Sequence, residues 1–323
     1  MIRPSAPTRA QERAFQQSVI YASLFDYPLT VEQLRESLIG QAADESTLTN
    51  WYQCSPRLQA IIEFADGYYF PQGRHALVDT RQRREARSRQ LLAAHARALA
   101  LVTRMPFVRM VALSGSLAHL NADTGADLDL FVVAAPGRVW SVTVTTLALA
   151  RLCGWRSKLC LNYVVSERAL MVGPADLFSA NQIIHLHPLT GIPVYRRFLA
   201  ENRFVERFYP NFRARSAETA ADVRPGVGPG VGPGFSRAVS VLESVLNCTL
   251  APLYERVCRV AYGWHLRRRS HLWRSRDQVR LEAECLKLHT HSHRQEVMEQ
   301  FERALEQAAA VTHEESWPVR VAR

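Results

Sequence analysis

Hydrophobic residues in the first part of the chain recur at helical and then at strand spacing. Helical spacing is present over residues 14–25, Thr30 can cap a helix over 31–39, and a third helix is expected within 46–58. Two short apolar runs, 61–64 and 68–70, flank a turn of the hairpin type that contains Asp66-Gly67. Three helices followed by a hairpin predict a winged helix over residues 1–75.

The pattern beyond residue 75 predicts an α+β fold. One long helix is expected over 76–105, then buried strands over 107–113, 127–133 and 158–165, and a helix over 176–185. The strands predict a core with a mixed β-sheet and flanking helices within 76–223. The Gly/Pro repeat at 224–235 predicts a linker, and apolar positions at helical spacing predict an all-helical segment over 236–309 in a C-terminal helical domain, 236–323.

Candidate chemistry is concentrated between the first two core strands. Ser114-Gly115-Ser116 follows the first strand, and Asp127 and Asp129 lie where the second begins. Residues i and i+2 of a strand share a face, so the two carboxylates are expected to point together, while Leu128 and Leu130 pack in the sheet. Two neighbouring carboxylates repel each other unless a cation such as Mg²⁺ lies between them. The glycine turn opens a short helix, where backbone N–H groups favour phosphate.

The order Gly-Ser, about ten residues, then Asp-x-Asp on an apolar strand resembles the signature of the DNA polymerase beta nucleotidyltransferase superfamily. The resemblance implies that Ser114, Gly115 and Ser116 bind the triphosphate of an NTP such as ATP. It also implies that Asp127 and Asp129 are catalytic ligands of Mg²⁺, or of Mn²⁺, and that a nucleoside monophosphate is transferred to an acceptor.

A narrower resemblance covers most of the chain. The stretches 25–30, 114–133, 160–163 and 286–289 resemble a poorly characterised bacterial group of such proteins that begins with a winged helix. Where the superfamily places a third carboxylate, this chain has Asn162, a neutral residue that cannot act as a general base, and the group has Asn there too. The same resemblance makes Lys287 a candidate contact for the triphosphate, and Asn181 and Gln182 either polar contacts of the substrate or ordinary helix residues.

Composition and charge restrict the classes of partner that we expect. The chain of 323 residues has 47% hydrophobic residues and lacks an uninterrupted apolar stretch of membrane-spanning length, so we expect a cytoplasmic protein without a membrane partner. The formal net charge is +10, yet residues 1–75 carry 6 Lys and Arg against 8 Asp and Glu. Duplex DNA is therefore an unlikely partner for the winged helix, and a protein partner is the alternative.

Several hypotheses stay open. The leading one is a Mg²⁺-dependent nucleotidyltransferase acting on an unknown acceptor, which is a small molecule, RNA or a protein. Because of Asn162, a weak or inactive NTP-binding or docking protein is the alternative, and a winged-helix DNA-binding regulator is the third. The arginine run at 81–89 is either a solvated helix face or a basic wall beside the site. His289, His291 and His293 lack the spacing of a known zinc site.

Overall fold

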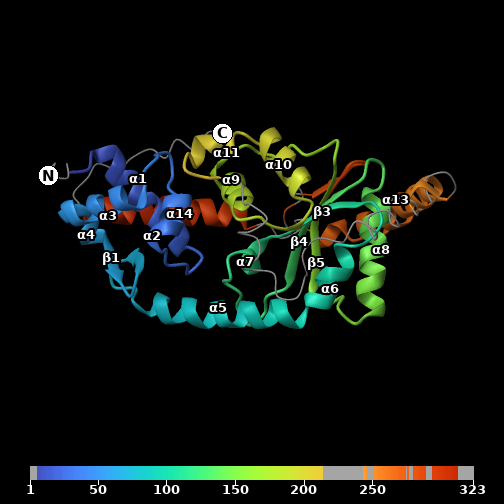
Figure 1. Cartoon of the computed structure of the whole chain (residues 1–323), viewed down its shortest axis with the longest axis horizontal. Coiled ribbons are helices and arrows are strands. Elements are labelled where there is room, and N and C mark those ends of the chain that lie inside the picture. The colour runs from blue at the N-terminus through green and yellow to red at the C-terminus, as the bar shows by residue number, and fades with distance from the viewer. Residues whose placement is uncertain are drawn as a thin grey trace.

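The computed structural model describes residues 6–213, 243–245, 250–273, 275, 279–288 and 293–311, except for the side chain of Asn162. Within this part the fold is mixed, with helices on both faces of a mixed β-sheet, in agreement with the predicted α+β class (Figure 1). The predicted linker at 224–235 lies outside the described residues.

Residues 6–75, called the N-terminal module below, form four helices and a hairpin. The elements are α1 (Arg9–Ser23), α2 (Val31–Glu36), α3 (Glu45–Cys54), α4 (Pro56–Ile61), β1 (Ile62–Ala65) and β2 (Tyr68–Pro71). Thr30 caps α2 as predicted, and its backbone N–H is in turn bonded by the side chain of Gln33. The predicted hairpin is confirmed, with positive φ at Asp66 and Gly67 in its turn. Its assignment as a winged helix stays a prediction.

The predicted single helix over 76–105 is wrong, because the chain forms two helices there. They are α5 (Ala76–Ala94) and α6 (Ala96–Val102), and they meet at His95, whose φ and ψ of −105° and 12° are not helical. The ring Nδ1 of His95 lies 2.9 Å from the carbonyl oxygen of Leu91, so the side chain covers the end of α5. Figure 1 shows α5 running along one side of the molecule, from the N-terminal module to the sheet.

Six strands form the core sheet in the order β6-β3-β4-β5-β8-β7. They are β3 (Val108–Leu113), β4 (Leu128–Ala134), β5 (Leu159–Ser166), β6 (His187–Thr190), β7 (Val279–Leu281) and β8 (Cys285–Leu288). Only the β4–β5 pair is parallel, and the other neighbours are antiparallel. The end of β3 and the starts of β4 and β5 therefore lie at one end of the sheet.

Each face of the sheet is covered by its own set of helices. On one face, α6, α8 (Val139–Leu152) and α13 (Ala251–Arg268) pack on alternate residues such as Leu128, Leu130 and Val132. On the other, α9 (Leu177–Ile184), α10 (Ile192–Glu201), α11 (Val205–Phe208) and α14 (Arg294–Val311) share one hydrophobic cluster with the N-terminal module and with Phe131 and Val133. The alternation of β4 therefore leaves Asp129 on the second face.

The prediction of an all-helical segment over 236–309 is wrong. Strands β7 and β8 occupy part of it, with a 3₁₀ turn at η2 (Ser270–Leu272) before them, and β8 pairs with β5 through Tyr163 and Lys287. The segment therefore completes the core sheet. How the chain divides into domains stays a prediction.

The N-terminal module is bound to the core by hydrogen bonds from several elements. Asn121, after α7 (Gly115–Ala118), donates to the carbonyl oxygen of Phe25 over 2.8 Å. Asn211 donates to the carbonyl oxygens of Arg35 and Ala43 over 2.9 and 2.8 Å. In Figure 1 the C-terminal helix α14 lies among the N-terminal helices, where Phe301 contacts Tyr21 edge to face. The module and the core therefore share one interface built from distant parts of the chain.

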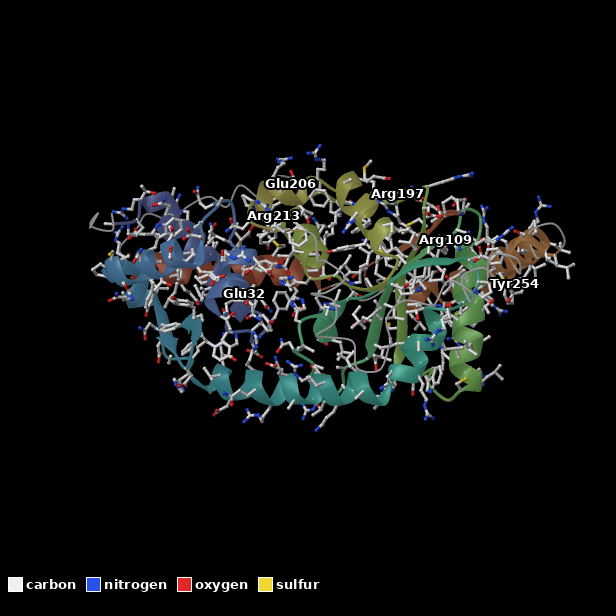
Figure 2. The ribbon with its side chains drawn as sticks, in the orientation of Figure 1. Glu32, Arg109, Arg197, Glu206, Arg213 and Tyr254 are labelled. Atoms are coloured by element: carbon white, nitrogen blue, oxygen red, sulfur yellow. The ribbon has the colours of Figure 1, made fainter. Side chains whose placement is uncertain are left out.

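An ion-pair network surrounds the start of β3. The guanidinium of Arg109 on β3 bonds both carboxylate oxygens of Glu243 over 2.9 and 2.8 Å and lies 3.6 Å from Glu167. Arg197 on α10 pairs with the same Glu167, and Figure 2 shows Arg197 on the helix above the strand of Arg109. The paired carboxylates raise the pKa of Arg109, which burial alone would lower.

None of the helices in the described ranges combines the length and the apolar character that crossing a membrane would require.

Candidate functional site

Gly115 and Asp129 are in contact at one end of the sheet. The backbone N–H of Ser114 donates to the carbonyl oxygen of Asp129 over 2.9 Å, which holds the end of β3 against the start of β4. Gly115 then turns the chain into α7 with a φ of +62°, and a Cβ atom there would lie 2.4 Å from Oδ2 of Asp129. A side chain at this position would be strained by the left-handed backbone and would have to displace the carboxylate of Asp129.

The two predicted carboxylates lie together but in different environments. Asp127 directly precedes β4 and has a side chain that is 45% exposed, 3.9 Å from the ammonium of Lys158. Asp129 is partly buried, and the pKa of its carboxyl is raised to about 6, mainly by burial; a hydrogen bond with Cys160 opposes the shift, and the charge of Asp127 adds to it. The two residues are two positions apart along the chain, so the charge of Asp127 disfavours ionisation of Asp129.

A pair of carboxylates fits Mg²⁺ that is delivered with a phosphate. Among the described residues, no three His, Cys, Asp or Glu side chains are grouped so that they could hold a metal ion by themselves. Mg²⁺ commonly takes one or two carboxylates and completes its shell with water and substrate phosphate. Asp127 and Asp129 could provide such a half-site, since a cation would offset the cost of burying the charge of Asp129.

Asn162 lies at an irregularity of β5. The register passes from Asp129 opposite Cys160 to Phe131 opposite Tyr163, so β5 contains one extra residue at positions 161 and 162. The strand therefore brings the backbone of Asn162 beside β4, one position beyond Asp129. Its contribution as a third ligand stays a prediction.

Lys287 borders the same cavity as Asp129, and Arg294 is a further bordering residue that the sequence did not indicate. A cavity of about 200 Å³ is bordered by Ser114, Gly115, Asp129, Lys287 and Arg294. Lys287 is buried on β8, with its ammonium 5.5 Å from the ring centroid of Tyr163. Arg294 begins α14 and forms an ion pair with the buried Asp176. Two cations thus border the cavity that the carboxylate of Asp129 also borders. Their positive charges would favour the binding of a polyanion there.

Ser116 borders a different cavity from Asp129. Gly115 and Gln182 line both cavities, whereas Ser116, Asn181 and His185 line only the second, which has a volume of about 160 Å³. Asn181 is buried and donates to the hydroxyl of Tyr209 over 3.1 Å, which gives it a structural role. The turn after β3 therefore lies between the two cavities.

The arginine run on α5 has mixed roles. Arg81 is buried, donates to the carbonyl oxygen of Pro28 over 2.8 Å, and stacks 3.8 Å from the ring centroid of Tyr27. Arg84 donates to the carboxylate of Asp26 over 3.1 Å. These two arginines attach the N-terminal module to α5, so neither the solvated face nor the basic wall describes the whole run. Of the three histidines near residue 290, only His293 is described, and it pairs with Glu296.

Comparison with known proteins gave no relative: no protein-family model, no curated protein and no solved structure matched the chain. The resemblance to the DNA polymerase beta superfamily therefore stays a prediction from the residues quoted above.

Proposed function

We propose that the chain is a Mg²⁺-dependent nucleotidyltransferase that moves a nucleoside monophosphate from an NTP to an acceptor. The observation that supports this most is the contact between Gly115 and the carboxylate of Asp129. It joins the turn predicted to bind phosphate to the carboxylate predicted to bind metal. Both groups also border a cavity that contains the cations Lys287 and Arg294.

Each residue has a distinct part in this proposal. The backbone at 114–116 would bind phosphate oxygens, and Asp127 and Asp129 would hold Mg²⁺ or Mn²⁺ together with those oxygens. When bound, the metal would neutralise the charge that develops on the transferred phosphoryl group and on pyrophosphate. Lys287 is well placed to contact the triphosphate, since it is buried on the strand that ends beside the cavity.

A nucleotide-binding protein without turnover is the second candidate. Within the described ranges, no third carboxylate joins Asp127 and Asp129 in a metal-binding group. A site with only two carboxylates favours nucleotide binding without turnover. A regulator that binds duplex DNA has less support, because Arg74 and Arg84 in the region of the hairpin and α5 already pair with Asp26. Release of pyrophosphate from Mg–NTP with cell extract as a source of acceptor would separate the enzyme from the binding protein.

The proposal is tested by thermal unfolding of the full chain with each of the four NTPs, with Mg²⁺ or with EDTA. At a ligand concentration near 100 times Kd, binding adds about 2.7 kcal/mol to the free energy of unfolding, which raises Tm by several degrees. We expect this rise with Mg²⁺, much less with EDTA, and none in Asp129→Ala. Asp79→Ala, an exposed acid at the start of α5, is the matched control and should respond as the wild type does. An unchanged Tm with all four Mg–NTP complexes would contradict the proposal.

A further inference from the structure

The second cavity lies between the N-terminal module and the core. Its volume is about 160 Å³, and it is bordered by Tyr21, Ala22 and Phe25 of the module and by Ser116 and His185 of the core. It adjoins the first cavity through Gly115 and Gln182, which line both. A molecule bound at the phosphate turn therefore has this cavity directly beside it.

Aromatic rings form much of the cavity wall. The imidazoles of His119 and His185 are in contact, with centroids 3.9 Å apart and planes tilted by 39°, although α7 and α9 that precede them are far apart in sequence. Tyr27 contacts His119 edge to face at 5.6 Å. Nδ1 of His185 lies 2.8 Å from the carbonyl oxygen of Asn181; a carbonyl only accepts, so this nitrogen carries a proton. The wall thus combines flat faces with polar ring edges.

One tyrosine that lines the cavity, Tyr21, is almost completely buried. Tyr21 is 3% exposed, and its hydroxyl makes no hydrogen bond to any other described residue. Burial and the neighbouring Tyr209 and Asp176 raise the pKa of Tyr21 well above its ordinary value, so the hydroxyl keeps its proton. Because buried polar groups are nearly always hydrogen-bonded, this hydroxyl is a donor that a bound group could satisfy once the side chain of Tyr21 shifts toward the cavity.

We propose that this cavity binds one planar ring that carries a hydrogen-bonding group. The ring would lie against the imidazoles of His119 and His185, and its polar group would bond the hydroxyl of Tyr21. The size supports a single ring, because a cavity of about 150 Å³ accommodates one benzene-sized molecule.

The inference also gives the N-terminal module a function. Tyr21, Ala22, Phe25 and Tyr27 all come from it, so the module supplies one wall of a ligand site. The identity of the ring rests on the proposed function: it is either the base of a pyrimidine NTP or part of the acceptor. Both sources present the same chemistry to the cavity.

The test uses the full chain with isotope-labelled histidine and follows the imidazole NMR signals of His119 and His185. The probes are uracil, nicotinamide and phenol as free rings, and Mg–UTP, Mg–CTP and Mg–ATP as nucleotides. We expect at least one single-ring probe to shift both signals, because a stacked ring changes the local magnetic field. If Mg–UTP or Mg–CTP shifts them and Mg–ATP does not, the ring is the base; if a free ring shifts them with Mg–NTP already bound, it is the acceptor.

Two variants assign the effect to the cavity. Ala22→Phe fills the space and should weaken binding of that probe at least tenfold, whereas Ala10→Phe, exposed on the same helix, should leave it unchanged. Tyr21→Phe keeps the ring and removes only the hydroxyl, so it should weaken binding about three- to tenfold. If no probe shifts the two histidines, or if both cavity variants bind the probe as the wild type does, the inference is wrong. Ring binding without any Mg–NTP stabilisation would retain this site and reject the nucleotidyltransferase.

Discussion

Replacing Asp129 by Asn should stabilise the metal-free protein. The carboxyl of Asp129 has its pKa raised from 3.8 to about 6, mainly by burial. Each unit of such a shift corresponds to about 1.4 kcal/mol, so the ionised carboxylate costs the folded state about 3 kcal/mol at neutral pH. Asn has nearly the same shape, carries no charge, and can still accept a hydrogen bond from Cys160. Asp129→Asn should therefore raise the free energy of unfolding by up to this amount.

The effect must depend on pH with a definite sign. A pKa that is higher in the folded state stabilises the protein below about pH 4, and this contribution is lost as the pH rises through about 6. The other titrating groups are common to both proteins and cancel in the comparison. The free energy of unfolding of the variant should thus equal that of the wild type near pH 4 and exceed it by up to about 3 kcal/mol at pH 7.5.

The measurement is urea and thermal unfolding of both proteins in EDTA between pH 4 and 8, and a difference of this size corresponds to roughly 5 °C in Tm. Asp127→Asn is the matched control: its carboxylate is exposed and pairs only loosely with Lys158, so its change should stay below about 1 kcal/mol. The reasoning would be refuted if Asp129→Asn were no more stable than the wild type at pH 7.5. It would also be refuted if the gain in stability at pH 4 were as large as the gain at pH 7.5.

Three further substitutions have separable outcomes. Gly115→Ala should lower stability by about 1–3 kcal/mol and abolish stabilisation by Mg–NTP, because its Cβ would displace the carboxylate of Asp129; a normal nucleotide response in thermal unfolding would contradict this. Gly191→Ala, also at positive φ, would place Cβ 2.1 Å from the backbone oxygen of Arg109, so it should cost more than about 2 kcal/mol while the surviving protein still responds to nucleotide. In a transfer assay, Asn162→Ala should reduce the rate about tenfold and Asp129→Ala about a hundredfold or more, and equal losses would make Asn162 a direct ligand.

Local signals in the sequence were sufficient for the elements that carry the candidate site. The turn at Asp66-Gly67 fixes the hairpin, because both residues adopt positive φ there. The run of apolar residues before Ser114 predicts β3, and the alternation from Asp127 to Leu130 predicts β4 with its correct faces, since each pattern is decided by neighbours in the chain.

Other features depend on contacts that no local pattern records. Strand β8 has only four residues, and its pairing with β5 is what makes it a strand, so helical spacing in the surrounding segment gave the wrong prediction. The meeting of His119 with His185, and the placement of Tyr21 beside them, require the N-terminal module to be docked on the core. Arg294 likewise reaches the first cavity only through α14.

Gly115 and Asp129 are two parts of one physical arrangement. The missing side chain at Gly115 allows the backbone of the turn to approach the carboxylate, and this close packing helps to remove Asp129 from water. The same removal raises the pKa of Asp129 and makes its ionised form less favourable. A divalent ion that arrives with a phosphate would relieve this cost at the carboxylate and place its anion against the turn. The glycine and the aspartate are therefore expected to fail together when either is changed, although they are fourteen residues apart in the sequence.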